Sequence, residues 1–592
     1  MKKGIFTYLM LLCFPVFVLA QWTDNSMLNT KISDTIGDQV LPKVVANVDN
    51  GESYISWFSN SGANQFDIYM QRLDADGNKM WADEGLLISD HPTMSWVTDY
   101  DLVIDNDGCA ILVTQDERTG SSDVFAYRIS PEGEFLWGAD GIALTNDTDF
   151  NPSPKALIDQ EGNIIVNWGV ESNGMFAKLA LQKLSVDGQL LWGENTVISS
   201  DSMHTLMPSI ILSEDTATTV VWIQTVSTDT AEGNWPKMYA YAQKIDKNGN
   251  LAWSDIVAID TAENMPLAFF SPSLASDADG GFFVGWKAFP VNALNHSCYV
   301  QHINTDGEAI WAQNGILASD SVQFGHANPK LTYLPQSDEL FLFWTANRDI
   351  NAGDNHIAIF GQKFSNTGEK LWTSQGTVFD GWYSTYDTTN MVLGIRPATD
   401  DDFTVFFEKE YVEGSPDTLL VSYYHAMRID GDGNFVWDNT KPVISKALST
   451  KSFPAFSNLT TNQWVVAWSD NRNDPQDEGV NGIYAQNISI DGDLGIITAI
   501  NEINQLHDNS ILNYPNPFQN QTTIEYKLSH KGNVNLNLLD VNGRLIKHLF
   551  NGHQQKGIHT IKLDVFGLSP GMYFVAFEHD GLMNYHKILI NN

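Results

Sequence analysis

The sequence predicts an all-β protein: a ring of eight repeats, closed by the N-terminal strand and followed by a small separate β domain. Three observations predict this fold. A short motif, seen first as DADGNKMW (74–81) and last as DGDLGI (491–496), recurs about every 59 residues. Short alternating apolar and polar runs lie between its copies, divided by Asp/Gly turns, and this pattern is typical of strands. The composition of the chain also changes near residue 511.

Length, charge and cysteine content exclude several classes of protein. The 592 residues carry 33 Lys and Arg against 72 Asp and Glu, a net charge of −39. Such a chain lacks the basic face that binding to nucleic acid or to an anionic membrane requires. Three cysteines are too few for a disulfide scaffold, and we expect Cys109 and Cys298 to be buried free thiols.

The N-terminus has the features of a secretory signal peptide. Lys2 and Lys3 precede the apolar run TYLMLLCFPVFVLA, which ends in a small-residue cleavage pattern. No other stretch approaches the roughly 20 apolar residues that a transmembrane helix needs. We therefore expect residues 1–20 to be removed during export, with no transmembrane segment in the mature chain.

The repeat predicts a β-propeller over residues 21–496. Each copy reads as four strands: the first usually opens with Pro, the second ends in Trp, the third carries a Gln, and the fourth carries the Trp of the motif. Four strands per unit without a helical pattern between them is the signature of a propeller blade, and a fixed period of this length is typical of such arrays. The turn glycines predict eight blades: Gly77, Gly133, Gly188, Gly249, Gly307, Gly368, Gly433 and Gly492.

The mature N-terminus supplies the strand that the last repeat lacks. The eighth repeat has Ile496 where its fourth-strand Trp should be, whereas WTDNSMLNTKIS (22–33) resembles WADEGLLIS (81–89), one period later. An open ring would leave a long unpaired strand edge. We therefore expect residues 22–33 to pair with the third strand of the eighth repeat, near 482–490.

The repeated residues have structural roles that explain them. Paired Trp side chains suit the interfaces between blades, Gly takes the φ > 0 position of each tight turn, and Asp accepts backbone N–H groups there. Calcium binding at these turns is the alternative, but they lack the additional acidic ligands of a complete site. We therefore predict no cofactor and no metal site, with Ca²⁺ as the alternative.

The end of the chain has a different chemistry. Residues 511–592 hold seven Lys and Arg against five Asp and Glu and no Trp, whereas the region between the signal peptide and residue 511 holds 24 basic and 67 acidic residues. The predicted domains are thus the signal peptide (1–20), the propeller (21–496), a linker (497–510) and a C-terminal domain (511–592). Alternating strands and turns in the last segment predict a small Ig-like β-sandwich.

This C-terminal segment contains NYPNPF (513–518), VNLNLLDVNGRLI (534–546), LSPGMYFVAF (568–577) and a terminal KILINN, in that order. It resembles the type A C-terminal sorting domain of the type IX secretion system of Bacteroidota. The resemblance implies a protein that is secreted or attached to the outer-membrane surface, with the type IX secretion machinery as its partner. The positions that match the family motifs are Tyr514, Pro515, Asn516, Pro517, Phe518, Asp540, Asn542, Gly543, Arg544, Gly571 and Tyr573.

The propeller region shows no catalytic motif, because it lacks a P-loop, a nucleophile elbow, HExxH, CxxC and a dinucleotide fingerprint. Its loops between second and third strands are long and dissimilar, as at 225–238 and 469–482, whereas the other turns are tight. Function usually lies on variable loops held by a rigid scaffold. The face that carries these long loops is therefore the candidate binding surface.

Three scarce arginines lie on that face. Arg118, Arg348 and Arg472 each follow a second strand, two of them near Asp116 and Asp470. The simplest interpretation is an ion pair that braces the loop. The alternative is bidentate recognition of an anionic glycan by Arg, with these five residues as its binding site. A further set recurs at one third-strand position and is interpreted as scaffold: Arg72, Arg128 and Arg428.

Two functional classes follow. The first is a secreted or cell-surface module that binds a glycan or protein ligand without catalysis. The alternative is a hydrolase or lyase that acts on extracellular polysaccharide from a propeller scaffold. The regular repeats and the lack of a singular polar cluster favour the first over the second, and whether the protein is an enzyme stays open.

Overall fold

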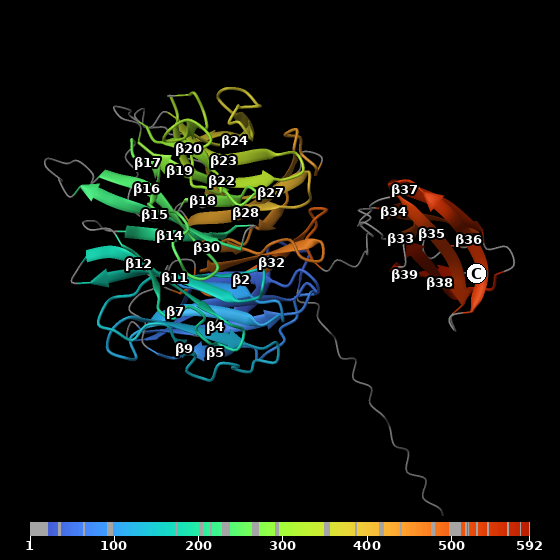
Figure 1. The fold of residues 1–592 in the computed structure, drawn as a ribbon, viewed down its shortest axis with the longest axis horizontal. Helices are drawn as coiled ribbons and strands as arrows, with labels where there is room; N and C mark the ends of the chain where they lie inside the picture. Colours follow the sequence, from blue (N-terminus) through green and yellow to red (C-terminus); the bar gives the residue numbers. More distant parts are fainter. Residues whose placement is uncertain are drawn as a thin grey trace, which may run out of the picture. The chain divides into compact units, whose positions relative to one another are not determined.

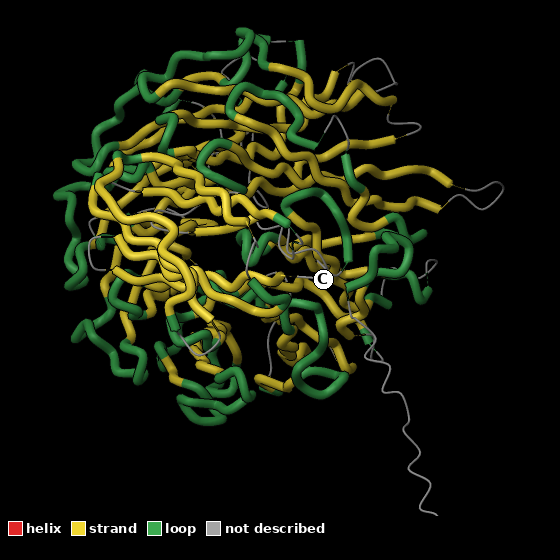
Figure 2. The backbone as a smooth tube through the Cα atoms, turned by 90° about the vertical axis from the view of Figure 1, so that its right-hand side faces the viewer, coloured by secondary structure: helices red, strands yellow, loops and turns green. Residues whose placement is uncertain are grey.

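The computed structural model describes residues 22–590 except 34–36, 63–64, 92–98, 173–174, 200–204, 214–215, 228–236, 263–271, 290–294, 322, 349–355, 385–387, 414–418, 438–440, 475–479, 496–510, 515–517, 519, 529–530, 541–543, 565–567 and 580–581. The described residues form strands, turns and loops and no helix (Figure 2). Accordingly, they contain no helix that could cross a membrane. The predicted signal peptide and linker lie outside the described residues. The all-β prediction is confirmed.

The chain divides into two compact units, residues 1–496 and 497–592. In the described part of the N-terminal unit, the repeats form eight four-stranded antiparallel sheets, coloured from blue to orange in Figure 1. Sheets 1 to 4 consist of β2 (Asp38–Ala46), β3 (Ser53–Gly62), β4 (Gln65–Leu73) and β5 (Leu86–Ser89); β6 (Asp101–Ile104), β7 (Ala110–Asp116), β8 (Asp123–Ile129) and β9 (Ile142–Ala143); β10 (Lys155–Ile158), β11 (Ile164–Ser172), β12 (Met175–Leu184) and β13 (Thr196–Ser199); and β14 (Thr205–Leu212), β15 (Thr218–Ser227), β16 (Lys237–Ile245) and β17 (Val257–Asp260).

Sheets 5 to 8 continue the pattern along the chain, except that sheet 8 takes its fourth strand from the N-terminus. They consist of β18 (Ser273–Ser276), β19 (Phe282–Ala288), β20 (Ser297–Ile303) and β21 (Ile316–Leu317); β22 (Gly325–Leu334), β23 (Glu339–Arg348), β24 (His356–Ser365) and β25 (Thr377–Ser384); β26 (Thr388–Pro397), β27 (Asp402–Glu413), β28 (Leu419–Asp430) and β29 (Val443–Ser445); and β30 (Lys451–Phe456), β31 (Gln463–Asp470), β32 (Gly482–Ser489) and β1 (Thr30–Ser33).

The first strands of the sheets lie around a common centre. Each first strand from β2 to β22 contacts the first strand of the next sheet, and β30 contacts β2. Between β26 and β30, the Arg396 guanidinium donates to the carbonyl of Phe456 at 2.9 Å. The arrangement is propeller-like, because each sheet presents its first strand to the centre and its fourth strand to the outside.

The predicted pairing of the N-terminal segment with the last repeat is confirmed. Strand β1 pairs antiparallel with β32, with Thr30 opposite Ala485 and Lys31 opposite Tyr484. The side chain of Ile32 is fully buried in a core that also contains Ile483 of sheet 8. Sheet 8 thus combines residues more than 440 positions apart in the sequence, and its outer edge is covered by β1.

Neighbouring sheets are locked together by the Trp of the repeat motif. This Trp lies in the segment before the fourth strand, as Trp81 does before β5, whereas the sequence predicts it within that strand. Its indole N–H donates to a backbone carbonyl in the tight turn of the following sheet, and the ring packs on the Gly of that turn. The bond measures 3.0 Å from Trp81 Nε1 to Pro131 O and 2.8 Å from Trp311 Nε1 to Asn366 O. A Cβ on Gly249 would lie 2.7 Å from the Trp192 ring, so the turn needs Gly for close approach as well as for its φ of +87°. The predicted interface role of Trp is confirmed.

Buried Gln side chains hold the fourth strand to the third. Gln301 Nε2 donates to Ala312 O at 2.7 Å, while its Oε1 accepts the backbone N–H groups of His302 and Trp311. These side-chain hydrogen bonds take the place of backbone hydrogen bonds between strands in the segment that follows the turn, where regular strand pairing is interrupted. The same position is fully buried in six repeats: Gln71, Gln182, Gln243, Gln301, Gln362 and Gln486.

The cationic side chains of the third strands are scaffold, as predicted. Arg428 binds Asp402 through both carboxylate oxygens, with Nε–Oδ1 at 2.8 Å and Nη2–Oδ2 at 2.7 Å. Arg72 pairs with Glu52, and Arg128 pairs with Asp105 at 2.6 Å. Each pair joins the third strand to the region between the first and second strands of the same sheet.

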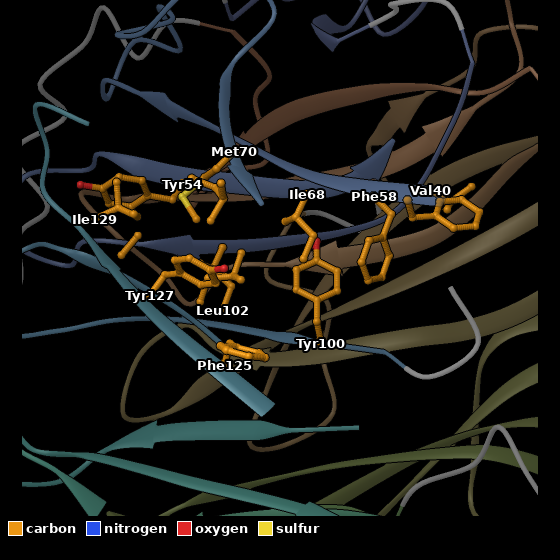
Figure 3. Packing of buried hydrophobic residues seen from close by; sticks show 14 residues of the cluster. Val40, Tyr54, Phe58, Ile68, Met70, Tyr100, Leu102, Phe125, Tyr127 and Ile129 are labelled. Carbon is orange, nitrogen blue, oxygen red and sulfur yellow. The ribbon is translucent and has the colours of Figure 1, made fainter. Parts of the chain in front are cut away.

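Aromatic packing between sheets 1 and 2 illustrates the core (Figure 3). The rings of Phe58 and Tyr100 meet edge to face, with centroids 4.7 Å apart. The Tyr100 hydroxyl donates to the carbonyl of Leu41 at 3.0 Å, so the aromatic body packs while its polar group is satisfied. Cys109 and Cys298 are buried free thiols, as expected.

The C-terminal unit contains seven strands in its described residues: β33 (Ile511–Tyr514), β34 (Gln521–Leu528), β35 (Gly532–Asp540), β36 (Leu545–Gln554), β37 (Gly557–Asp564), β38 (Gly571–His579) and β39 (Leu582–Ile590). They form two sheets, β33-β34-β37 and β36-β35-β38-β39. Side chains from both sheets share one apolar core, which includes Tyr526, Leu536 and Phe577.

Candidate functional site

Arg118 is held by its own sheet. Its guanidinium binds both carboxylate oxygens of Asp116, from Nε at 3.0 Å and from Nη2 to Oδ2 at 2.6 Å. Nη1 donates to Asp140 O at 2.8 Å, Nη2 donates to the Tyr127 hydroxyl, and the group lies 3.8 Å from the centre of the Phe125 ring. These contacts match the bracing interpretation of this residue, and its binding role stays a prediction.

Arg472 makes the same kind of clamp in sheet 8. It pairs with the buried carboxylate of Asp470 and lies 3.8 Å above the Tyr484 ring. Although burial raises the pKa of Asp470, the Arg472 guanidinium outweighs burial and lowers it below its ordinary value. Nη1 donates to Leu28 O at 2.7 Å and Nη2 to Asn29 Oδ1 at 3.1 Å, so Arg472 also ties down the closing N-terminal segment.

Arg348 ends β23 and stacks on Trp382, with its guanidinium carbon 4.4 Å from the ring centre. Each of the three arginines belongs to a different sheet: Arg118 to sheet 2, Arg348 to sheet 6 and Arg472 to sheet 8. The binding site formed by these arginines with Asp116 and Asp470 stays a prediction.

The Asp side chains of the tight turns are engaged by backbone amides. Asp74 Oδ1 accepts the N–H groups of Asp76 at 3.0 Å and Asn78 at 2.8 Å, and Oδ2 accepts the Asn78 amide. Among the described residues there is no group of three or more His, Cys, Asp or Glu side chains that could hold a metal ion.

A cavity of about 1060 Å³ lies at the centre of the N-terminal unit. First strands supply most of its lining, including Pro42 of sheet 1, Ser273 of sheet 5, Lys330 of sheet 6 and Arg396 of sheet 7. We call this cavity the central channel. A cavity of this size with a few polar groups in its lining is the ordinary form of a ligand site.

A repeated bulge shapes the channel wall. Leu41, Asn328 and Phe453 each have a φ between 52° and 53° and each precedes a Pro. The strand register shifts at these points, as between Ala327 and Lys330. Because Pro cannot donate to the ladder, the unpaired bulge accommodates it, and this explains the Pro that recurs in first strands.

Two lysines near the channel are neutralised by one carboxylate. Lys43 Nζ lies 2.7 Å from Asp99 Oδ1 and Lys155 Nζ lies 2.5 Å from Asp99 Oδ2. Burial alone would raise the pKa of Asp99, but the two ammonium groups hold it well below its ordinary value. Asp101 also faces this wall, where its Oδ2 accepts the N–H of Ala156 at 3.0 Å.

Two other cations in the channel have a different environment. Burial, and then the charge of Arg396, lowers the pKa of Lys330. Burial also lowers the pKa of Arg396. The Arg396 guanidinium is anchored by carbonyl groups, with Nη1 2.9 Å from Ile395 O and Nη2 2.9 Å from Phe456 O. The channel therefore holds two half-buried cations, one of them fixed in place.

Sequence reasoning singled out the Arg residues of the loops and missed the channel cations. A signal was present, because Lys follows the first-strand Pro in three repeats, at Lys43, Lys155 and Lys330. The pattern could not show that two of these residues, Lys43 and Lys330, line one cavity, since that depends on the ring of first strands.

The sorting-domain motif residues lie in the C-terminal unit. Phe518 is buried and forms a parallel bridge with Ile590, and its N–H donates to Leu589 O at 3.0 Å. Arg544 N–H donates to Asp540 Oδ1 at 2.9 Å. Tyr514 ends β33, and Gly571 and Tyr573 lie in β38. Other motif positions lie outside the described residues: Pro515, Asn516, Pro517, Asn542 and Gly543.

Among solved structures, an ulvan lyase of polysaccharide lyase family PL25 is similar to this chain at 11% identity, covering 78% of this chain and 96% of its own, with a TM-score of 0.42. A Dyadobacter fermentans protein of unknown function matches at 12% identity over 58% and 95%, with a TM-score of 0.33. A Penicillium chrysogenum α-L-arabinanase matches at 11% identity over 57% and 92%, also at 0.33. These likenesses concern the fold and assign no activity to this chain. No curated protein matches it.

The C-terminal unit is matched by a family model. The model for the secretion system C-terminal sorting domain matches residues 513–591, which agrees with the motifs of the sequence and with the separate fold of this unit. The chain therefore carries a C-terminal sorting domain of the type IX secretion system.

Proposed function

We propose that the N-terminal unit is a secreted, eight-bladed β-propeller that binds an extracellular polysaccharide at its central channel. The single observation that carries this proposal is the cavity of about 1060 Å³ lined by the first strands. It is large enough for several sugar residues, and its lining combines apolar side chains with a few polar groups.

The route of the protein supports an extracellular ligand. The sorting domain indicates secretion, with attachment to the cell surface as a further step, and implies recognition by the type IX machinery. In this proposal residues 1–20 are the signal peptide, 21–496 the propeller, 497–510 a linker and 511–592 an Ig-like sorting domain. The three loop arginines and their aspartates remain candidates for additional contacts with the ligand.

The ligand site is tested by narrowing the channel. Met391 lines the cavity and is 37% exposed, so Met391→Trp adds bulk without disturbing a buried core. A matched control is Met80→Trp, because Met80 is 45% exposed and does not line the cavity. A glycan array followed by calorimetry on residues 21–592 should show binding that Met391→Trp weakens and Met80→Trp preserves. Equal binding by both variants would move the ligand site elsewhere.

Cleavage of the polysaccharide is the second candidate function. The observation that favours it is Lys330, a group with a lowered pKa inside an open cavity, since such groups are common among catalytic acids and bases. The low likeness to polysaccharide-cleaving enzymes concerns the fold, so the choice rests on the channel. Incubation of the purified protein with polysaccharides, with detection of new reducing ends and of unsaturated products, separates a hydrolase or lyase from a binding module.

A further inference from the structure

We propose that Lys330 and Arg396 form an oxyanion-binding subsite in the central channel, which recognises the carboxylate or sulfate group of an acidic sugar. This inference rests on the proposed function, because it names the chemical class of ligand that the channel accepts. It concerns one wall of the channel, formed by β22 and β26.

The first argument is that these two cations lack a carboxylate partner in a strongly acidic protein. The chain carries 72 Asp and Glu. Lys43 and Lys155, near the same channel, share Asp99 as a counterion. Among the described residues, by contrast, no carboxylate pairs with Lys330 or Arg396, and the charge that acts most on Lys330 is the like charge of Arg396.

The second argument is geometric. Lys330 directly follows the bulge at Asn328 and Pro329 and lines the cavity, as Arg396 does. The carbonyls of Ile395 and Phe456 hold Nη1 and Nη2 of Arg396. A guanidinium has five N–H groups, so an anchored Arg396 retains donors that can bind a planar or tetrahedral oxyanion.

A hydroxyl completes the subsite. Ser273 of β18 lines the same cavity, and its Oγ accepts the N–H of Leu331 at 3.1 Å. Because that bond uses the oxygen as an acceptor, the hydroxyl proton is available to donate. An ammonium, a guanidinium and a hydroxyl from three neighbouring sheets thus line one cavity, a set of donors that suits a group with two or three oxygens.

The third argument is energetic. Burial lowers the pKa of both groups, and the like charge of Arg396 lowers that of Lys330 further, so the two cations are held in a channel that disfavours their charged forms. An anion bound between the two cations would replace their repulsion by attraction. The channel would therefore favour an acidic sugar over a neutral one. The rest of the protein is acidic and repels a polyanion, so this attraction is confined to the channel wall.

The experiment measures binding of radiolabelled sulfate to residues 21–592 by equilibrium dialysis at low ionic strength. We expect one sulfate per chain, and a loss of affinity of about tenfold or more in Lys330→Met, as for removal of a charged hydrogen-bond donor. Arg396→Lys, which keeps the charge and loses the anchored fork, should weaken binding less than Lys330→Met. The matched control is Lys43→Met, which removes one channel charge while Asp99 keeps Lys155.

Competition experiments distinguish a sugar carboxylate from a sugar sulfate as the preferred anion. Galacturonate and galactose 6-sulfate should both displace sulfate, the tighter competitor identifying the preferred group, whereas galactose should not. Absence of sulfate binding, or equal losses in Lys330→Met and Lys43→Met, would overturn the subsite. If polysaccharide still binds in either case, the proposed function stands; if sulfate binds but no polysaccharide does, the subsite stands and the proposed function fails.

Discussion

The indole Nε1 of Trp22 donates to the backbone carbonyl of Ala75 at 3.0 Å, which joins the segment before β1 to the tight turn of sheet 1. The ring packs on Gly77 of the same turn and is 3% exposed. The seven other glycines of the repeat motif, from Gly133 to Gly492, each receive the motif Trp of the preceding sheet in the same way. Trp22 therefore takes the place of the Trp that repeat eight lacks, and it closes the ring of interfaces.

Trp22→Ala should destabilise the N-terminal unit. Loss of a buried indole costs about 3–5 kcal/mol of unfolding free energy, because the cavity is only partly refilled. Urea denaturation followed by circular dichroism measures this cost. Met27→Ala is the control, since Met27 lies in the same segment but is 42% exposed. Equal stability of the two variants would contradict closure by this segment.

The packing of Trp on turn glycines predicts a difference between two Gly→Ala variants. Gly249 and Gly138 have φ values of +87° and +86°, so in both variants Ala must adopt a left-handed backbone conformation. This should lower the free energy of unfolding by about 1–2 kcal/mol. A Cβ at Gly249 also meets the Trp192 ring, whereas nothing lies within 4 Å of one at Gly138. The free energy of unfolding of Gly249→Ala should therefore be lower by about a further 1–3 kcal/mol. Equal melting temperatures of the two variants would contradict this prediction, because the turn would then be able to move and relieve the contact with the Trp ring.

Arg472→Ala should lower the melting temperature. Asp470 is fully buried and would lose its cationic partner, and such a loss costs about 3–5 kcal/mol. Arg472→Ala combined with Asp470→Asn should recover part of the loss, because no buried charge remains. Glycan binding measured on the same variants tests the binding interpretation. Weakened binding at an unchanged melting temperature would support a direct contact with the ligand.

Glu408 predicts a pH dependence of stability. Burial and then the nearby Glu410 raise its pKa to about 7, against an ordinary value of 4.5. Between these two pH values the folded state binds the proton more tightly than the unfolded state. Stability therefore falls as the pH rises from about 4.5 through 7, and it stays reduced above 7.

Glu408→Gln should remove this pH dependence. The variant should match the parent near pH 4.5 and exceed it near pH 8.5 by up to about 3 kcal/mol. Urea denaturation at the two pH values measures the difference. If the parent protein is as stable as Glu408→Gln at pH 8.5, then Glu408 ionises in the folded state without a cost in stability.

Deletion of residues 511–592 should abolish export and leave the N-terminal unit folded. The two units are separately compact, so the loss of one leaves the core of the other intact. The truncated protein should accumulate inside the cell envelope, and fractionation with immunoblotting measures this. Normal appearance of the truncated protein in the medium would show that the sorting domain is dispensable.

The sequence by itself determined the repeating architecture and the export signal. A period of about 59 residues, with Gly and Trp at constant positions, implies strands and turns that are local in the chain, and local patterns can be read directly. The likeness of residues 22–33 to 81–89 also predicted the partner of the first strand, because a missing repeat element must be supplied from elsewhere. The sorting domain was evident from its ordered motifs.

Only the tertiary structure decided which polar residues share a site. Lys330 and Arg396 are 66 positions apart and occupy different repeats, and their proximity depends on how first strands converge at the centre. In the same way, Arg472 reaches Leu28 and Asn29 only because the ring closes. A sequence pattern reports the period within one repeat, whereas a site formed between repeats depends on the angle and distance at which the sheets pack, and these arise from the summed shapes of many buried side chains.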